Sequence, residues 1–320
     1  MEPVPVSIII PNYNGEQMLS QNIRSVLEAA GAYPGECETI LVDDASQDQS
    51  VALVAGDFPA IQIVRHVVNR GFSEAVQTGI ASARHPVCIL LNTDVRPEPE
   101  FIAPLVRWFE QESTFAVSPL ISDPDGHPQR VSWNRVKIVR GDIRKCNWDL
   151  QTARDRARKT GPLKSLYASG GSVAIRKAMF LQLGGFLGLY KPFYYEDRDL
   201  CTRAWQRGWA TFFEPAGIVI HDDRQGTIKR FFAAPQIKII KRRNRFFYLW
   251  LHLSARRLMC SHLPWILWRL PLRLVRGDTV YVRALGRALC TSGEIIQRRQ
   301  GLRSDHGFKS LEDIIVEIDA

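Results

Sequence analysis

Four short runs rich in Val, Ile and Leu, separated by stretches of helical periodicity, restrict the fold more than any other feature of this chain. The apolar runs occupy residues 6–10, 39–43, 61–65 and 87–91. Short runs of this composition are typical of strands that are covered on both faces. The segments with helical spacing cover roughly residues 16–30, 48–56, 73–84 and 99–111. Because strand and helix alternate, the sequence predicts an α/β fold with a mostly parallel sheet and helices on both faces.

The regular pattern is interrupted at two places. Pro11 directly follows the first run and is expected to end that strand, with Asn14 and Gly15 forming the turn into the next helix. From about 119 to 165, several prolines and a charged run predict a long irregular excursion. Regularity returns with a strand around 173–175 and a helix from about 177.

The basic charge of the chain is concentrated in its last third. Between Arg224 and Arg303, 18 lysines and arginines stand against two acids, although the whole chain of 320 residues has a net charge of only +9. The remainder is therefore net acidic. We expect an acidic α/β domain over residues 1–225, followed by a basic, amphipathic helical region over residues 226–320.

The basic region contains apolar patches, at 246–251 and 263–275, that arginines and prolines interrupt or flank. No uninterrupted apolar run approaches the ~20 residues that a membrane-spanning helix needs. Amphipathic helices rich in Arg and Trp suit the interface of an anionic membrane, and they equally suit a subdomain packed on the rest of the protein. So much basic charge could also bind nucleic acid. The abundance of Leu, Ile and Trp disfavours that alternative, and no nucleic-acid partner is expected.

The six cysteines are scattered along the chain and include no Cys-x-x-Cys pair. A disulfide framework is therefore not expected, and a reducing cytoplasm fits better. The first residues lack a basic segment followed by an apolar stretch, so no secretory signal is visible. The sequence predicts a cytoplasmic protein, and its basic helical region suits a peripheral position on an anionic membrane surface.

Polar residues directly follow the predicted strands. Asp43 and Asp44 end the second strand, and Asn92 and Asp94 follow the fourth. In open α/β sheets, ligands bind beyond the carboxyl ends of the strands. Asp43 and Asp44 can accept hydrogen bonds from a ribose or a pyrimidine base, or they can cap the next helix. Asn92 and Asp94 can direct oxygens at Mg²⁺ or Mn²⁺, or they can form an ordinary turn before Pro97.

A second acidic cluster, at Glu196, Asp197 and Asp199, lies about 100 residues further on. Carboxylates are favoured at helix N-termini, which is one explanation of the cluster. Three acids in four residues exceed what a cap requires, and crowded like charges raise the pKa of at least one of them. A general base needs that tuning, so we expect catalysis from this cluster. His221 ends a later apolar run and becomes a candidate ligand only beside a cation bound to Asp94.

The chain carries, in order, Pro11-Asn12-Tyr13-Asn14-Gly15, Val42-Asp43-Asp44-x-Ser46, Asn69-x-Gly71-Phe72, Leu91-Asn92-x-Asp94, Gly170-Gly171, Glu196-Asp197-x-Asp199-Leu200-Cys201-x-Arg203 and His221. As an ordered set these motifs resemble the family 2 glycosyltransferases, which have the GT-A fold, over roughly residues 5–250. The chain is similar in particular to the bacterial rhamnosyltransferase-like branch of O-antigen and cell-wall polysaccharide synthesis. Arg243-Asn244-Arg245 also suits that branch.

The resemblance implies a role for each matching position. The residues implied to surround the substrates are Pro11, Asn12, Asn14, Asp43, Asp44, Asn69, Gly71, Asn92, Gly170 and Gly171. Among these, Asp43 and Asp44 would hold the nucleoside, and Gly170 and Gly171 would line the acceptor side. A divalent metal, Mn or Mg, would bind to Asp94, with His221 as a further ligand.

Asp197 would be the catalytic base, with Glu196 and Asp199 shaping its surroundings. Residues up to about 118 would bind the nucleotide sugar, and residues 119–225 would serve the acceptor and the chemistry.

The implied activity is the inverting, metal-dependent transfer of one sugar from a nucleoside-diphosphate sugar, with dTDP-rhamnose or a UDP-sugar as the suggested donor. The acceptor would be a hydroxyl of a glycan or of a polyprenyl-diphosphate-linked sugar. The Gln-x-x-Arg-Trp signature of processive synthases is missing, because residues 206–209 read Gln-Arg-Gly-Trp. Two alternatives stay open: a metal-dependent nucleotidyltransferase, and a degenerate glycosyltransferase-fold scaffold, which Asn92 in place of the usual first carboxylate would allow.

Overall fold

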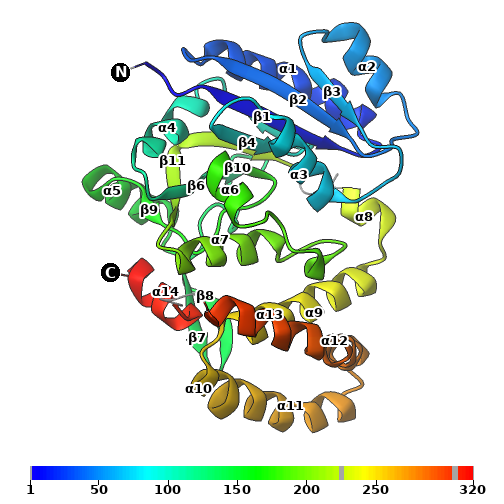
Figure 1. The fold of residues 1–320 in the computed structure, drawn as a ribbon, viewed down its shortest axis with the longest axis vertical. Helices are drawn as coiled ribbons and strands as arrows, with labels where there is room; N and C mark the ends of the chain where they lie inside the picture. Colours follow the sequence, from blue (N-terminus) through cyan, green and yellow to red (C-terminus); the bar gives the residue numbers. More distant parts are fainter. Residues whose placement is uncertain (1, 223–226, 305–308, 320) are drawn as a thin grey trace.

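A nine-stranded sheet forms the centre of the protein, with strand order β3-β2-β1-β4-β10-β6-β11-β5 and β9 paired to β11 (Figure 1). The computed structural model describes residues 2–222, 227–304 and 309–319. The four predicted strands are β1 (Val6–Asn12), β2 (Cys37–Asp43), β3 (Gln62–Arg65) and β4 (Val87–Leu91), and they run parallel to one another. Both faces of β1 and β4 are buried, as their Val- and Ile-rich composition predicts.

The second half of the sheet mixes strand directions. Its strands are β5 (Val95–Pro97), β6 (Thr114–Ser122), β9 (Leu163–Lys164), β10 (Ser172–Arg176) and β11 (Ala210–His221). β10 is antiparallel to both of its neighbours, whereas β6 and β11 are parallel to each other. Because β1–β4 run parallel, as do β6 and β11, the prediction of an α/β fold with a mostly parallel sheet is confirmed.

Helices cover the sheet on both faces where the periodicity predicts them. They are α1 (Glu16–Ala32), α2 (Ser50–Asp57), α3 (Phe72–Ser82), α4 (Ile102–Val106) and α6 (Lys177–Gln182). The helix expected over 99–111 is divided, because α4 gives way to the 3₁₀ turn η1 (Arg107–Glu110). A second 3₁₀ turn, η2 (Gly188–Tyr190), precedes α7 (Glu196–Gln206), which carries the acidic cluster at its first turn.

Two local expectations are wrong. Pro11 does not end β1, which continues to Asn12 and pairs with β2 alone beyond Ile9. With a neighbour on one side only, the missing N–H of proline costs little. The segment 119–165 is more regular than expected: β6 extends to Ser122, and the hairpin β7 (Val136–Val139)/β8 (Asp142–Lys145) and the helix α5 (Leu150–Thr160) follow.

The C-terminal third is helical, and it packs beneath the sheet and α7 (Figure 1). It contains α8 (Thr227–Phe231), α9 (Ala234–His252), α10 (Ala255–Arg257), the π-turn η3 (Leu258–His262), α11 (Leu263–Val275), α12 (Thr279–Cys290), α13 (Ser292–Ser304) and α14 (Leu311–Asp319). One hydrophobic core includes residues of the sheet and of α9, α12 and α14. The expected boundary at 225/226 falls outside the described residues. Within the described part of the chain, none of the helices is both long and apolar enough to cross a membrane.

Candidate active site

A pocket of about 650 Å³ opens beyond the carboxyl ends of β1, β2 and β3. Its lining consists of Tyr13, Ala45, Ser46, Gln47, Arg65, His66, Val67, Val68 and Asn69. Only Asn69 belongs to the predicted set of substrate-contacting residues. Arg65 and His66 were not predicted as site residues, because neither stands in a sequence motif.

Asn12 and Asn14 join the two loops that frame this pocket. The side-chain N–H₂ of Asn12 donates to Asp43 Oδ1 at 3.0 Å and to Ser50 Oγ at 2.9 Å. Asn14 has a left-handed backbone with φ of 50°, and its Oδ1 accepts from the backbone N–H of Gln47 at 2.8 Å. The loop after β1 and the loop after β2 are therefore held as one unit. Pro11, by contrast, lies within β1.

Asp44 holds the wall of the same pocket. Its buried carboxylate accepts from the backbone N–H groups of Arg70 at 2.8 Å and Gly71 at 2.7 Å, and it meets His66 Nδ1 at 2.7 Å. Gly71 has φ of +89°, a conformation that favours glycine. In this structure both oxygens of Asp44 have protein partners, so the carboxylate shapes the pocket through the turn at 69–71. Direct contact of Asp43 and Asp44 with a nucleoside stays a prediction.

Asp94 and His221 come together at the edge of the sheet, where Asp94 immediately precedes β5 and His221 pairs with Val95. His221 Nε2 lies 3.4 Å from Asp94 Oδ2. Asp94 Oδ1 and Asn92 Oδ1 are buried without a hydrogen-bond partner among the described residues. Because an unpaired buried oxygen is unfavourable, these atoms are suited to a bound cation. An oxygen-rich set with one imidazole fits Mn²⁺ or Mg²⁺.

Gly170 and Gly171 connect this edge of the sheet to the acidic cluster. The backbone N–H of Gly170 lies 3.4 Å from Asp197 Oδ2. A Cβ atom on Gly171 would lie 2.9 Å from Asn92 Nδ2, which is too close for a side chain. The glycine pair therefore passes close to both the half-buried Asp197 and the side chain of Asn92, and a role of the two glycines on the acceptor side stays a prediction.

Glu196 and Asp197 are adjacent acids at the start of α7. Burial raises the pKa of Glu196, and the neighbouring Asp197 adds to that increase. Burial also raises the pKa of Asp197, against the lowering effect of Arg198. Glu196 Oε2 has no hydrogen-bond partner among the described residues. A carboxylate with a raised pKa accepts a proton more readily near neutral pH, which is the property of a general base.

Asp199 has a different environment from its two neighbours. It is fully buried, and it bonds to Arg203 Nε at 2.7 Å, His252 Nε2 at 2.9 Å and Tyr190 Oη at 3.1 Å. Burial alone would raise its pKa, but the Arg203 ion pair and the His252 contact lower the pKa of Asp199 to about 2. Since Asp199 is fully buried and bonded to both helices, it acts as a positioning residue that ties α7 to α9.

A strained turn precedes the acidic pair. Tyr194 and Tyr195 have φ of 72° and 81°, values that non-glycine residues rarely adopt. The side-chain N–H₂ of the buried Asn244, on α9, lies 2.8–2.9 Å from the carbonyl oxygens of Tyr190, Phe193 and Tyr194. Asn244 therefore holds the turn from which Asp197 projects. Its position in a basic helix, within Arg-Asn-Arg, was the only sequence signal.

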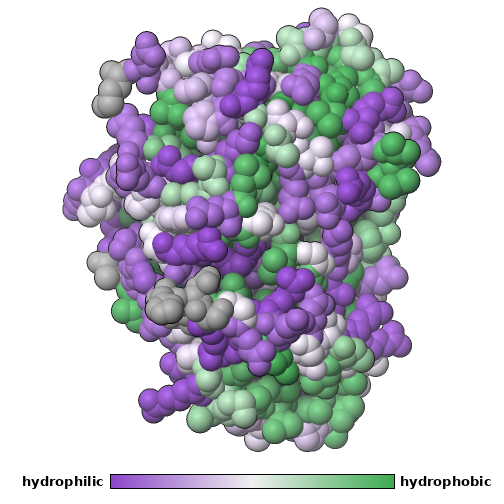
Figure 2. Space-filling view, in the orientation of Figure 1, coloured by the Kyte–Doolittle hydropathy of each residue, from purple (hydrophilic) through white to green (hydrophobic). Residues whose placement is uncertain are grey.

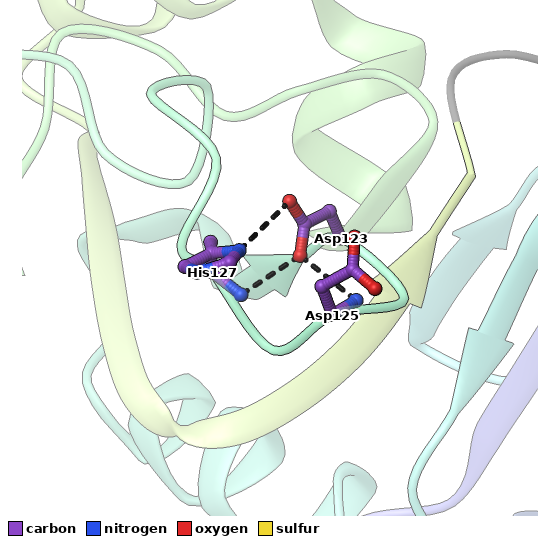
Figure 3. Close-up of side chains that lie close together, drawn as sticks. All are labelled: Asp123, Asp125 and His127. Atoms are coloured by element: carbon purple, nitrogen blue, oxygen red, sulfur yellow. Dashed lines mark hydrogen bonds and ion pairs between the residues drawn. The ribbon is translucent and has the colours of Figure 1, made fainter.

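A third polar cluster, Asp123, Asp125 and His127, lies in the loop after β6 (Figure 3). The Asp123 carboxylate accepts from the backbone N–H groups of Asp125 at 3.0 Å and His127 at 2.8 Å, and the His127 ring lies 3.4 Å away. These bonds are those of an aspartate-capped turn. The cluster is thereby explained as local structure, and we assign no ligand to it.

Comparison with known proteins shows which family the chain resembles. A family model described as Glycosyl transferase family 2 matches residues 7–184. An undecaprenyl-phosphate 4-deoxy-4-formamido-L-arabinose transferase of Pseudomonas fluorescens is 35% identical over 117 residues, which are 34% of this chain and 34% of that protein. Polypeptide N-acetylgalactosaminyltransferase 6 of Bos taurus is 25% identical over 68% of this chain and 38% of its own length. The chain thus spans little more than a third of these curated relatives.

Two solved structures share the fold. GalNAc-T7 with UDP, GalNAc and Mn²⁺ has a TM-score of 0.60 at 20% identity, covering 79% of this chain and 49% of that one. The mannosyltransferase PcManGT from Pyrobaculum calidifontis, in complex with GDP-Man and Mn²⁺, has a TM-score of 0.57 at 18% identity, covering 100% of this chain and 86% of that one. The family match covers more than half of the sequence. This chain therefore belongs to glycosyl transferase family 2.

Proposed function

We propose that the protein transfers one sugar from a nucleoside-diphosphate sugar to an acceptor hydroxyl, with inversion at the anomeric carbon. One observation carries the proposal: Gly170 and Gly171 bring the half-buried Asp197 next to the strand-end turn that bears Asn92 and Asp94. A base close to a metal-binding set is what a single displacement at the anomeric carbon requires.

The donor would lie along the carboxyl ends of β4, β1 and β2. Its base would occupy the 650 Å³ pocket beside Tyr13 and Arg65. Its diphosphate would reach Asp94 and His221, which would hold the divalent metal. When bound, the metal supplies charge neutralisation to the departing nucleoside diphosphate. The Mn²⁺ complexes of GalNAc-T7 and PcManGT, each with its nucleotide or nucleotide sugar, support this assignment.

In the reaction, the acceptor oxygen attacks the anomeric carbon while the bond from that carbon to the diphosphate oxygen breaks. Asp197 takes the proton of the acceptor hydroxyl, and the electron pair of the broken bond leaves with the nucleoside diphosphate. The raised pKa of Asp197 favours this proton transfer. Asp199 and Asn244 keep the helix and its preceding turn in place during the step.

For the acceptor we propose a lipid-linked or surface glycan, built at the inner face of the cell membrane, with dTDP-rhamnose or a UDP-sugar as the donor. The relative whose name contains undecaprenyl phosphate supports a lipid-linked acceptor. An apolar patch at the α11 end of the molecule supports a membrane surface (Figure 2). The exposed apolar residues there are Met259, Leu267, Trp268, Leu272, Leu274 and Val275. Together with the exposed Arg256 and Arg276 they give the mixed surface of an interfacial helix.

Thermal unfolding with UDP, dTDP, GDP and ADP, each with and without Mn²⁺ or Mg²⁺, tests the donor site directly. A ligand at 100 times its dissociation constant adds about 2.7 kcal/mol to the free energy of unfolding. We expect one pyrimidine diphosphate to stabilise the protein only with metal, and Asp94→Asn to abolish that response. No response to any diphosphate from a folded sample would contradict the proposal and favour the scaffold alternative.

A further inference from the structure

Three cations from three separate elements lie near Asp197. Arg198 is on α7, Lys145 ends β8, and Lys241 is on α9, and these elements converge below the sheet in Figure 1. All three side chains interact electrostatically with Asp197. Segments almost 100 residues apart in the sequence therefore present like charges to one place.

Tyrosine rings contact all three cations and hold them in place. The Arg198 guanidinium lies 4.3 Å from the centre of the Tyr167 ring and 4.6 Å from that of Tyr195. Lys145 Nζ lies 5.9 Å from the Tyr167 ring centre, and Lys241 Nζ lies 5.1 Å from that of Tyr194. Contacts with ring faces orient the cations without neutralising their charge. Lys145 and Lys241 are exposed and Arg198 is half-buried, so the aromatic contacts hold three cations that a bound anion can reach.

None of these three cations has a carboxylate ion pair among the described residues. Neighbouring Arg245, by contrast, pairs with Asp142. The Asp197 carboxylate accepts backbone N–H groups, those of Arg198 at 2.7 Å and Gly170 at 3.4 Å. Lys145 Nζ donates one hydrogen bond to the carbonyl oxygen of Arg130 at 2.7 Å. Partial desolvation and then the nearby Arg198 lower the pKa of Lys145 to about 8. An additional anion bound beside Lys145 would therefore stabilise its charged form.

We propose that Lys145, Arg198 and Lys241 form a subsite for a phosphate or diphosphate group carried by the acceptor. The inference rests on the proposed function, because it names the class of acceptor for that same base. Arginine and lysine donors bind phosphate oxygens with charge-assisted hydrogen bonds. An anion held beside Asp197 places the first sugar attached to it at the base. The accepting hydroxyl therefore belongs to a sugar close to the phosphate.

The β7/β8 hairpin links this subsite to the α11 end of the molecule. Lys145 lies at the open end of the hairpin, and Arg140 and Gly141 lie at its tip. His262 Nδ1 contacts the Gly141 carbonyl oxygen at 2.7 Å, and the Arg140 guanidinium lies 4.9 Å from the Trp265 ring centre. The hairpin thus spans the distance between Lys145 of the proposed subsite and the helices that carry the apolar patch.

The test measures inorganic pyrophosphate binding by calorimetry in EDTA, so that metal-dependent donor binding does not contribute. The double variant Lys145→Gln/Lys241→Gln should bind at least about tenfold more weakly than the wild type, as expected for lost charged hydrogen bonds. The matched control is Lys137→Gln/Arg144→Gln, which removes the same charge from the other face of the same hairpin. The control should bind pyrophosphate like the wild type.

Unchanged pyrophosphate binding in the double variant, or an equal loss in the control, would overturn the subsite. The metal-dependent response to nucleoside diphosphates, measured on the same samples, separates this failure from failure of the proposed function, because it reports the donor site alone. Farnesyl diphosphate and phosphatidylglycerol vesicles distinguish the sources of the anion. Farnesyl diphosphate should bind with the same sensitivity to the double variant. Sensitivity of vesicle binding alone would make the lysines a membrane contact and would also overturn the proposal.

Discussion

Asp197 and Asp199 stand two residues apart on one helix, and their surroundings give them opposite properties. Asp197 is half-buried beside Gly170, with a raised pKa. Asp199 is fully buried between Arg203 and His252, with a pKa lowered to about 2. One carboxylate is thus suited to accept a proton, and the other to remain charged under all physiological conditions.

Replacing Asp197 by Asn removes the proton acceptor and keeps the shape of the side chain. We expect turnover to fall at least ~10²-fold, the scale of general-base catalysis, with donor affinity unchanged. Steady-state kinetics with a donor-binding measurement would show this split. Turnover equal to that of the wild type would mean that another group is the base.

Glu196 should make stability depend on pH. Its pKa is raised in the folded state, so the protonated form favours folding. That stabilisation is present below the ordinary carboxyl pKa and is lost as the pH rises through the folded-state value. Glu196→Gln, which stays neutral, should therefore gain stability over the wild type from pH 5 to pH 9 in thermal unfolding. A difference that does not change with pH would contradict the raised pKa.

Asp199 should show the opposite sign. Its pKa is depressed on folding, so its contribution is present above the ordinary carboxyl value and is lost as the pH falls towards about 2. Asp199→Asn leaves Arg203 buried without its partner, which costs about 3–5 kcal/mol at neutral pH. Denaturant unfolding should show that this cost shrinks below pH 4. A constant cost down to pH 3 would contradict the assignment.

At the scale of elements, α9 controls the turn before α7. Its Asn244 contacts three carbonyl oxygens of residues 190–194, next to the strained Tyr195. Asn244→Ala should lower turnover by about tenfold or more, because a loosened base is misplaced, while metal-dependent donor binding stays intact. Gln236→Ala, at the exposed N-terminus of the same helix, is the control. Equal effects of the two variants on turnover would show that α9 acts through stability alone.

The local strand and helix signals predicted most elements, because both depend on neighbouring residues. Residues 6–10 and 87–91 have the composition of buried strands, and they are strands. The prediction that Pro11 ends β1 was wrong, because the effect of a proline depends on which side of the strand has a partner. That is a property of the assembled sheet. The short strands after 122 are stabilised by distant contacts, such as Gly141 with His262, and carry little local signal.

The same contrast between local signals and distant contacts decides which features of the site could be predicted. The proximity of Asp94 and His221 could be predicted because strand ends converge at one edge of a sheet, whereas their role as metal ligands stays a prediction. The separate environments of Asp197 and Asp199 could not be predicted, because Asp199 acquires its partner His252 from a helix 53 residues away. An Asp–Arg pair at i and i+4, Asp199 and Arg203, was the one local hint of a structural role.

At the scale of the whole molecule, the apolar patch at α11 should attach the protein to membranes. Leu267 and Trp268 are 68% and 60% exposed, which favours insertion into a lipid interface. Leu267→Asn/Trp268→Ala should reduce sedimentation with vesicles rich in phosphatidylglycerol, and salt should release the wild type because arginines contribute. Val316→Asn, at an equally exposed site on α14, should leave sedimentation unchanged. Wild-type sedimentation of the double variant would remove α11 from the interface.

The packing of the β7/β8 hairpin on η3 also keeps the distance between the apolar patch and Asp197 constant. Each strand of the hairpin has four residues and spans about 13 Å, and its tip is fixed to the helices that carry the apolar patch. If α11 lies in the lipid interface, Asp197 is then held at one height above the bilayer. Hydroxyls at that height can be glycosylated, and those further out on a longer glycan pass beyond the base. Selection of the acceptor by its distance from the lipid would thus follow from rigidity alone.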